Sequence, residues 1–209
     1  MVLVKLSISL LSIKNRLEFI KKINDYDIDY IHIDVMDNTF TNNVAYSIEE
    51  INEINKISNK KLDIHLMVND PIKYINSFNN MNIEYIIFHV EIDKDINNLI
   101  NTVHGMGYKC GLAVNPNTNI DVLEQYINNI DLILVMSVMP GYGGQLFINS
   151  IYNKLEFLRN KYKNITISVD GGINQDNIYK LSSLVDMVVI GSYLSTETKE
   201  KIDMIKNIK

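Results

Sequence analysis

The run at residues 29–35, Asp29-Tyr30-Ile31-His32-Ile33-Asp34-Val35, is short, largely apolar and rich in β-branched side chains, which is typical of a buried β-strand. Seven more runs of this kind recur along the chain of 209 residues. They occupy residues 3–9, 62–67, 84–89, 108–114, 131–137, 165–170 and 186–191. The sequence therefore predicts eight strands.

Segments with a helical spacing of apolar residues separate these strands. They occupy residues 14–25, 47–58, 71–80, 93–105, 119–128, 150–162, 174–183 and 197–207. Leu17, Ile20 and Ile23, for example, recur every three residues, which places them on one helix face. Asp70-Pro71 puts a proline at a first helical position, and Asn174 is a candidate N-cap, as is Asn149-Ser150.

Eight alternating strand–helix units predict an α/β protein with a parallel sheet. The leading interpretation is a closed (β/α)₈ TIM barrel that residues 1–209 form as a single domain. An open, doubly wound sheet is the alternative, but the first strand lacks the glycine-rich turn that would favour it. The sequence also lacks a linker rich in Pro, Ser or Gly that would mark a domain boundary.

Composition limits the partners that this chain can have. Its net charge of -5 argues against binding to nucleic acid, which favours a basic surface. Its one cysteine, Cys110, cannot form an intramolecular disulfide, which fits the reducing cytoplasm. The apolar segment at residues 1–13 lacks the positive leader and cleavage site of a signal peptide, and the chain lacks a run of about 18 apolar residues that a membrane helix needs. We therefore expect a cytoplasmic protein that binds neither nucleic acid nor membrane.

Acidic and histidine side chains cluster at the predicted strand ends, where a TIM barrel builds its functional site. Because side chains alternate along a strand, His32 and Asp34 share one face of their strand, and His65 lies at the end of the next strand. Asp170 ends the seventh strand. If these faces point inward, the four side chains converge as nitrogen and oxygen ligands suited to Zn²⁺, Fe²⁺ or Mn²⁺. The alternative is that the histidines are hydrogen-bonded core residues and the aspartates cap helices.

Glycines follow the last three predicted strands. Gly141-Tyr142-Gly143-Gly144 comes after the sixth strand, Gly171-Gly172 after the seventh and Gly191-Ser192 after the eighth. Glycine lets backbone N–H groups approach an anion closely, and helix N-termini add a favourable dipole. Each pair alone is typical of a turn, but three on adjacent loops predict a phosphate site.

Other residues near the strand ends have less specific patterns. Met36, Met67 and Met136 are candidates for an apolar floor under a metal ion, or for plain core filling. His89 and Glu91, after the fourth strand, either reach the mouth of the barrel or belong to the core.

These motifs together resemble the ribulose-phosphate 3-epimerase family. The resemblance covers about residues 5–193, and its motifs fall in order on successive strands. The matching stretches are residues 9–12, 32–37, 62–68, 88–91, 115–116, 135–138, 140–145, 169–172 and 191–192.

The resemblance implies a metal-dependent epimerase that inverts C3 of a ketose phosphate, typically D-ribulose 5-phosphate to D-xylulose 5-phosphate in the pentose phosphate pathway. It implies a divalent metal, foremost Zn²⁺ with Fe²⁺, Mn²⁺ or Co²⁺ as alternatives, held by His32, Asp34, His65 and Asp170. Asp34 would accept the proton and Asp170 would donate one. The residues implied to contact substrate are Ser9, His65, Gly141, Tyr142, Gly143, Gly144, Gly171, Gly172, Gly191 and Ser192. We also expect a homo-oligomer.

Four residues depart from the family's usual pattern, namely Ile8, Asn42, Met139 and Ser168. None removes a proposed metal ligand, but Asn42 and Met139 lie in loops expected to shape the sugar pocket. D-allulose 6-phosphate is therefore the alternative substrate.

Two further classes of function are alternatives: a non-catalytic sugar-phosphate-binding barrel, and an aldolase or decarboxylase on a similar barrel, although the Asp-x-Lys-x-x-Asp signature of the related phosphate decarboxylases is absent. A non-catalytic sugar-phosphate-binding barrel would be expected to lose one of the two catalytic carboxylates, yet Asp34 and Asp170 are both present. A Schiff-base aldolase needs a lysine inside the barrel mouth, whereas Lys5 and Lys109 lie near the starts of their strands.

Overall fold

The structure, a computed structural model, describes residues 4–196 and 198–208. Its strands form one sheet in which eight parallel strands follow the order β1-β9-β8-β7-β6-β5-β4-β2, and a β1–β2 pairing closes the barrel. The strands are β1 (Lys5–Ser9), β2 (Tyr30–Asp37), β3 (Val44–Ala45), β4 (Lys61–Met67), β5 (Ile83–His89), β6 (Lys109–Val114), β7 (Leu132–Met136), β8 (Thr166–Asp170) and β9 (Met187–Ile190). The predicted TIM barrel is confirmed, and the open sheet is excluded.

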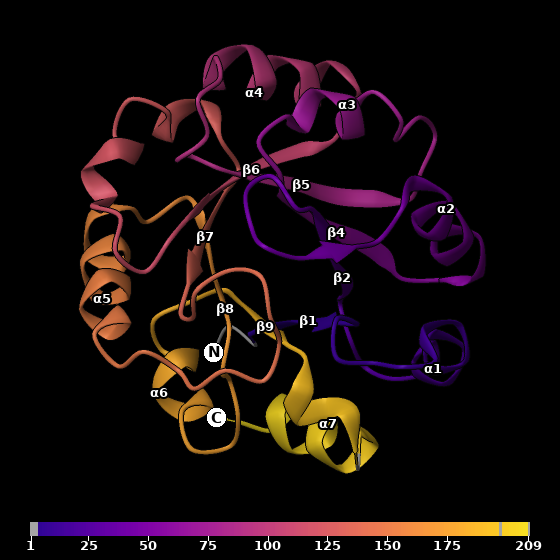
Figure 1. The fold of residues 1–209 in the computed structure, drawn as a ribbon. Coiled ribbons are helices and arrows are strands. Elements are labelled where there is room, and N and C mark those ends of the chain that lie inside the picture. Colours follow the sequence, from indigo (N-terminus) through magenta and orange to yellow (C-terminus); the bar gives the residue numbers. More distant parts are fainter. Residues whose placement is uncertain (1–3, 197, 209) are drawn as a thin grey trace.

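Helices surround the barrel as an outer ring (Figure 1). The α-helices are α1 (Arg16–Ile23), α2 (Ile48–Ile57), α3 (Pro71–Ile75), α4 (Ile96–Gly105), α5 (Ile151–Lys161), α6 (Ile178–Ser182) and α7 (Thr198–Lys206). Three short 3₁₀ helices complete the connections: η1 (Ile120–Leu123), η2 (Ile127–Asn129) and η3 (Ser192–Ser195).

Alternation along the strands produces two apolar layers. In β2, Ile31, Ile33 and Val35 belong to the large core cluster that the helices cover. Tyr30 belongs to a second cluster, which fills the inside of the barrel. The buried members of this inner cluster are Tyr30, Tyr85, Ile87, Ala113, Leu132, Leu134, Met136, Val138, Met187 and Val189.

Strand register brings the polar residues of the interior together. Ser9 pairs with His32, and His32 pairs in turn with Asp63. Two residues further along the strands, Asp34 pairs with His65. Because residues in register on neighbouring parallel strands point to the same side, these pairs form two successive polar rows at the carboxyl end of the barrel.

Two predicted helices are shorter than expected. The helix predicted at 71–80 ends at Ile75 and gives way to a turn in which Asn80 has a φ of 58°. In the segment predicted at 174–183, the Asn174 side chain accepts from the N–H of Asp176, and the Asn177 side chain accepts from the N–H of Asn174. These side chains satisfy N–H groups ahead of the helix, as caps do, and α6 begins at Ile178.

Two other differences lie in the connections between strands. The helix predicted at 119–128 is replaced by the 3₁₀ helices η1 and η2. The short strand β3, which pairs antiparallel with the end of β2, was not predicted.

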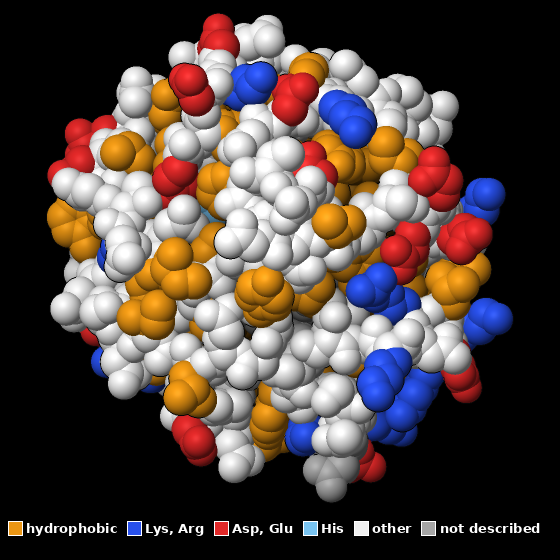
Figure 2. All heavy atoms as spheres, in the orientation of Figure 1, with side chains coloured by type: hydrophobic (Ala, Val, Ile, Leu, Met, Phe, Trp, Pro, Cys, Tyr) orange, Lys and Arg blue, Asp and Glu red, His pale blue; other side chains and the backbone are white. Residues whose placement is uncertain are grey.

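Charged side chains lie mostly toward the edge of the face shown in Figure 2, whereas its centre is made of uncharged and apolar groups. Within residues 4–196 and 198–208, we find no helix with the length and apolar character needed to cross a membrane. Cys110 is a free cysteine buried in β6.

Candidate active site and metal centre

His32, Asp34, His65 and Asp170 meet inside the carboxyl end of the barrel, with ligand atoms that all lie within 4.8 Å of one another. Oδ1 of Asp34 is 3.3 Å from Nε2 of His32 and 3.4 Å from Nδ1 of His65. Oδ2 of Asp170 is 3.9 Å from Nε2 of His32. Ligand atoms bound tetrahedrally to Zn²⁺ at about 2.0–2.1 Å are about 3.3–3.4 Å apart, so the two shortest separations suit such an ion.

Two ring nitrogens of this cluster are buried without a hydrogen-bond partner, Nε2 of His32 and Nδ1 of His65. The opposite nitrogen of each ring is anchored. Nδ1 of His32 lies 2.8 Å from Oδ2 of Asp63, and Nε2 of His65 lies 2.9 Å from Nε2 of His89. Buried polar atoms are rarely left unsatisfied, and both unsatisfied nitrogens face Asp34. The residues present therefore fit a divalent metal ion.

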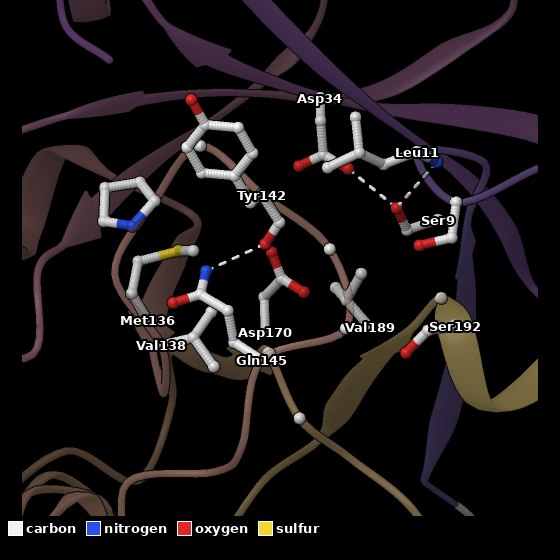
Figure 3. Close-up of a pocket in the computed structure, with 18 of the residues that line it drawn as sticks. Ser9, Leu11, Asp34, Met136, Val138, Tyr142, Gln145, Asp170, Val189 and Ser192 are labelled. Carbon is white, nitrogen blue, oxygen red and sulfur yellow. Dashed lines mark hydrogen bonds between the residues drawn. The ribbon is translucent and has the colours of Figure 1, made fainter. Parts of the chain in front are cut away.

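Asp34 is held from its other side by Ser9. The Ser9 hydroxyl donates a hydrogen bond of 2.7 Å to Oδ2 of Asp34, and it accepts one of 3.3 Å from the N–H of Leu11. Figure 3 shows Asp34 and Asp170 reaching into the same pocket, with Ser9 beside Asp34. One oxygen of Asp34 thus faces the histidines while the other is restrained by a hydroxyl.

The two carboxyl groups have different proton affinities. Burial raises the pKa of Asp34, but the charge of His32 and the contacts with both histidines outweigh it and hold that pKa well below its usual range. Burial, and then the negative charge of Asp34, raise the pKa of Asp170 to about 7. At neutral pH Asp34 is ionised, whereas Asp170 readily holds a proton. An acid–base pair requires such a division.

The three buried histidines also differ. Burial lowers the pKa of His32, but the charges of Asp34 and Asp63 outweigh it and raise the pKa well above its ordinary value. Burial lowers the pKa of His65 to about 4 and also lowers that of His89. In the metal-free chain, His32 therefore holds an extra proton that a metal ion must displace.

The loops after β1, β7, β8 and β9 line a pocket beside the cluster. They contribute the residues predicted to bind phosphate, namely Gly141, Tyr142, Gly143, Gly144, Gly171, Gly172, Gly191 and Ser192. Gly172 has a φ of 63°, and a Cβ there would lie 2.4 Å from the backbone nitrogen of Phe147. This position requires glycine because two stretches of backbone approach each other closely.

Contacts between two loops cover one side of the pocket. The hydroxyl of Tyr142 donates to the carbonyl of Asn42 at 2.9 Å, and the side-chain amide of Asn43 donates to the carbonyl of Gly141 at 2.8 Å. The β7–α5 loop is thereby tied to the β2–β3 loop. Asn42, one of the four residues that depart from the family's usual pattern, lies at this junction and contacts Tyr142 through its backbone carbonyl.

A model of the ribulose-phosphate 3 epimerase family matches residues 4–195. The chain belongs to this family. Among its relatives, the ribulose-phosphate 3-epimerase of Buchnera aphidicola subsp. Baizongia pistaciae is 38% identical, with 86% of this chain and 85% of the relative covered. The ribulose-phosphate 3-epimerase of Bacillus subtilis is 31% identical, with 91% of each chain covered. The family and enzyme class expected from the motifs are confirmed.

Solved structures share the fold at lower identity. The 3-hexulose-6-phosphate synthase from Salmonella typhimurium matches with a TM-score of 0.75 at 16% identity, and the match covers 98% of this chain and 97% of that one. At this identity the likeness concerns the barrel alone.

This member of the ribulose-phosphate 3-epimerase family brings its four expected metal ligands together, while their roles stay predictions. Of the three methionines, Met67 and Met136 line the pocket, and Met36 is buried in the outer core cluster. His65, also predicted to contact substrate, is fully buried, and its role in substrate binding is not tested by this geometry.

Asp63 is a site residue that the sequence analysis did not assign. It anchors His32 and also accepts a hydrogen bond of 3.1 Å from the Ser7 hydroxyl. Alternation along the strand places Asp63 on the same face as His65, two residues later, but does not indicate that it binds His32.

Proposed function

We propose that this chain is a metal-dependent epimerase that converts D-ribulose 5-phosphate to D-xylulose 5-phosphate. The observation that carries this proposal is a pair of carboxyl groups that reach into one pocket, Asp34 from β2 and Asp170 from β8. The pKa of Asp34 is lowered and that of Asp170 is raised. Strands β1 and β9 separate β2 from β8 around the barrel, so the two groups approach the pocket from different sides.

Inversion at C3 removes a proton next to the C2 carbonyl and returns one to the opposite face of the same carbon. Asp34, which is ionised at neutral pH, accepts the proton from one face. Asp170, whose pKa is raised to about 7 in the metal-free chain by burial and then by the negative charge of Asp34, donates to the other face. In the reverse direction the two groups exchange roles.

His32, Asp34, His65 and Asp170 would hold the divalent ion, which we propose to be Zn²⁺. When bound, it supplies positive charge that stabilises the negative oxygens of the enediolate formed between the two proton transfers. Ser9 keeps Asp34 oriented during these transfers through its hydrogen bond of 2.7 Å.

The glycine-rich loops after β7, β8 and β9 would bind the phosphate. They line the same pocket, where backbone N–H groups can approach an anion without interference from Cβ atoms. Binding the phosphate at these loops would direct C3 toward Asp34 and Asp170.

Turnover with metal analysis tests this proposal. The purified chain should contain stoichiometric divalent metal and should epimerise D-ribulose 5-phosphate faster than D-allulose 6-phosphate. A preference for the hexulose phosphate would overturn the proposed substrate, and full turnover by a rigorously metal-free chain would overturn the proposed metal dependence.

A further inference from the structure

A chain of three side chains, of which the two histidines are buried, leads away from the metal cluster. Nε2 of His65 lies 2.9 Å from Nε2 of His89, and Nδ1 of His89 lies 3.0 Å from Oε2 of Glu91. Both imidazoles have no exposed surface. The other end of the chain is Nδ1 of His65, which faces Asp34 and has no hydrogen-bond partner.

The identity of these atoms determines where the protons lie. Two Nε2 atoms at hydrogen-bond distance need one proton between them, so either His65 donates to His89 or the reverse. A carboxylate only accepts hydrogen bonds, so Nδ1 of His89 must carry a proton toward Glu91. A neutral imidazole carries one proton, so with Nδ1 of His89 donating to Glu91 its Nε2 is the acceptor. The proton of His65 therefore lies on Nε2, and its Nδ1 keeps a free lone pair.

We propose that Glu91 and His89 are positioning residues that hold the proton of His65 on Nε2 and thereby keep its Nδ1 available to the metal ion. This inference rests on the proposed metal-dependent function and extends it beyond the residues that would touch the ion. A ligand histidine is generally oriented through its second nitrogen, and loss of such a partner typically weakens metal binding about 10–100-fold.

Glu91 can impose this choice because its own position is fixed. Its Oε1 accepts a hydrogen bond of 2.7 Å from the N–H of Asn115 and one of 2.5 Å from the Thr118 hydroxyl, both on the loop after β6. Its Oε2 is left for His89. We call His65, His89 and Glu91 together the relay. The ring of Phe40 packs against that of His89 from the side of the β2–β3 loop, with 4.4 Å between the ring centroids.

The two ligand histidines are fixed through opposite nitrogens. Asp63 engages Nδ1 of His32 and leaves its Nε2 for the ion, whereas His89 engages Nε2 of His65 and leaves its Nδ1. A single carboxylate suffices for the first ring. For the second ring an imidazole intervenes, which accepts a proton from His65 at one nitrogen and donates one to the Glu91 carboxylate at the other.

The protons can be located directly by ¹⁵N NMR of the imidazoles, since the chain has only four histidines. The metal-free and zinc-loaded wild-type chains should both show the proton of His65 on Nε2 and that of His89 on Nδ1. A proton on Nδ1 of metal-free His65 would overturn the proposal without any variant.

Glu91→Gln gives a sharper test because the backbone N–H of Asn115 cannot change its role. The amide oxygen of the glutamine must therefore face Asn115, and its NH₂ group must face Nδ1 of His89. His89 then donates from Nε2, and the proton of His65 moves to Nδ1. We expect this inversion in the NMR spectrum and a zinc dissociation constant, measured by competition with a chelator, that rises about 10–100-fold.

His89→Phe provides a second variant that keeps a ring packed against Phe40 but removes the acceptor. It should weaken zinc binding by a similar factor. The matched control is His104→Phe, which disrupts the exposed pair between His104 and Asp131 and should leave zinc affinity unchanged. Wild-type zinc affinity in both relay variants would overturn the proposal.

The outcomes separate this proposal from the proposed function. In one outcome, the wild-type chain binds zinc with the proton of His65 on Nε2, and zinc affinity falls in both variants, but the wild-type chain does not epimerise D-ribulose 5-phosphate. This outcome supports the roles of His89 and Glu91 and refutes the proposed function. An active wild-type chain whose zinc affinity survives both variants supports the function and refutes the relay.

Discussion

Ser9 donates a hydrogen bond of 2.7 Å to Oδ2 of Asp34, the carboxylate oxygen that faces away from the two ligand histidines. The hydroxyl fixes the rotation of the carboxyl group and leaves Oδ1 toward Nε2 of His32 and Nδ1 of His65. One serine thus orients a residue that would serve both as a metal ligand and as a proton acceptor.

Replacing Ser9 with alanine should therefore lower kcat and leave the fold largely unchanged. A hydrogen bond to a charged group contributes about 1.5–3 kcal/mol, which corresponds to a loss of about 10–100-fold if it is needed in the transition state. Steady-state kinetics and the unfolding temperature would check this. An unchanged kcat would show that Asp34 does not depend on Ser9 for its orientation.

Removal of the metal ion should abolish activity and leave the barrel folded. The proposed ligands sit at strand ends, while the core cluster between the sheet and the helices is apolar and independent of them. This differs from a zinc finger, which folds only with its ion. Circular dichroism and turnover should be recorded before chelation, after it and after zinc is restored. Full turnover in the chelated sample would contradict the metal requirement.

Zinc affinity should increase as pH rises from about 6 to 8. In the metal-free chain the pKa of His32 is raised well above its ordinary value and that of Asp170 is raised to about 7, so both groups hold protons at the lower pH. A metal ion competes with these protons, and each proton released makes apparent binding about tenfold tighter per pH unit while the group is still protonated. Calorimetry in buffers of different ionisation enthalpy counts the protons. Affinity that is constant over this range would contradict the assignment.

The sequence predicted the four clustered side chains because strand alternation is a local rule. His32 and Asp34 are two residues apart on one strand, and the barrel topology then brings His65 and Asp170 to the same end. The predicted strand ends also placed the glycine loops after β7, β8 and β9, where the structure has them beside the pocket.

The relay and the loop junction depend on relationships that local rules do not contain. His89 meets His65 across a β4–β5 pairing whose register shifts between Leu62 and Asp63. Tyr142 contacts the carbonyl of Asn42, which lies 100 residues earlier in the chain. Strand register and loop docking are set by tertiary packing, so neither contact could be inferred from spacing in a single sequence.

Gly172→Ala should destabilise the chain by more than about 2 kcal/mol and raise KM for the sugar phosphate. The residue has a φ of 63°, and an added Cβ would meet the backbone nitrogen of Phe147 at 2.4 Å, so the β7–α5 and β8–α6 loops would have to move apart. Gly105→Ala is the matched control, since a Cβ there meets nothing within 4 Å. Denaturant unfolding and KM measured for both variants check this. A Gly172→Ala variant that is as stable as the Gly105→Ala variant would contradict the close approach of Gly172 to the backbone of Phe147.

Hydrogen exchange at C3 in deuterated water should distinguish the two carboxyl groups. In the wild-type chain, Asp34 removes the C3 hydrogen from one face and Asp170 supplies a solvent-derived one to the other, so even the earliest D-xylulose 5-phosphate should carry deuterium at C3. A one-base mechanism would return part of the original hydrogen. Complete retention of that hydrogen in early product would refute the two-carboxylate assignment.

Variants assayed at saturating zinc extend this measurement to each residue. Asp170→Asn should form product about 10²–10⁴-fold more slowly, yet still exchange the C3 hydrogen of D-ribulose 5-phosphate with solvent through Asp34. Asp34→Asn should lose both exchange and product formation from this substrate, because the group that first removes the hydrogen is gone. Mass spectrometry of recovered substrate and product separates these patterns. Exchange that survives in Asp34→Asn but not in Asp170→Asn would reverse the roles of the two residues.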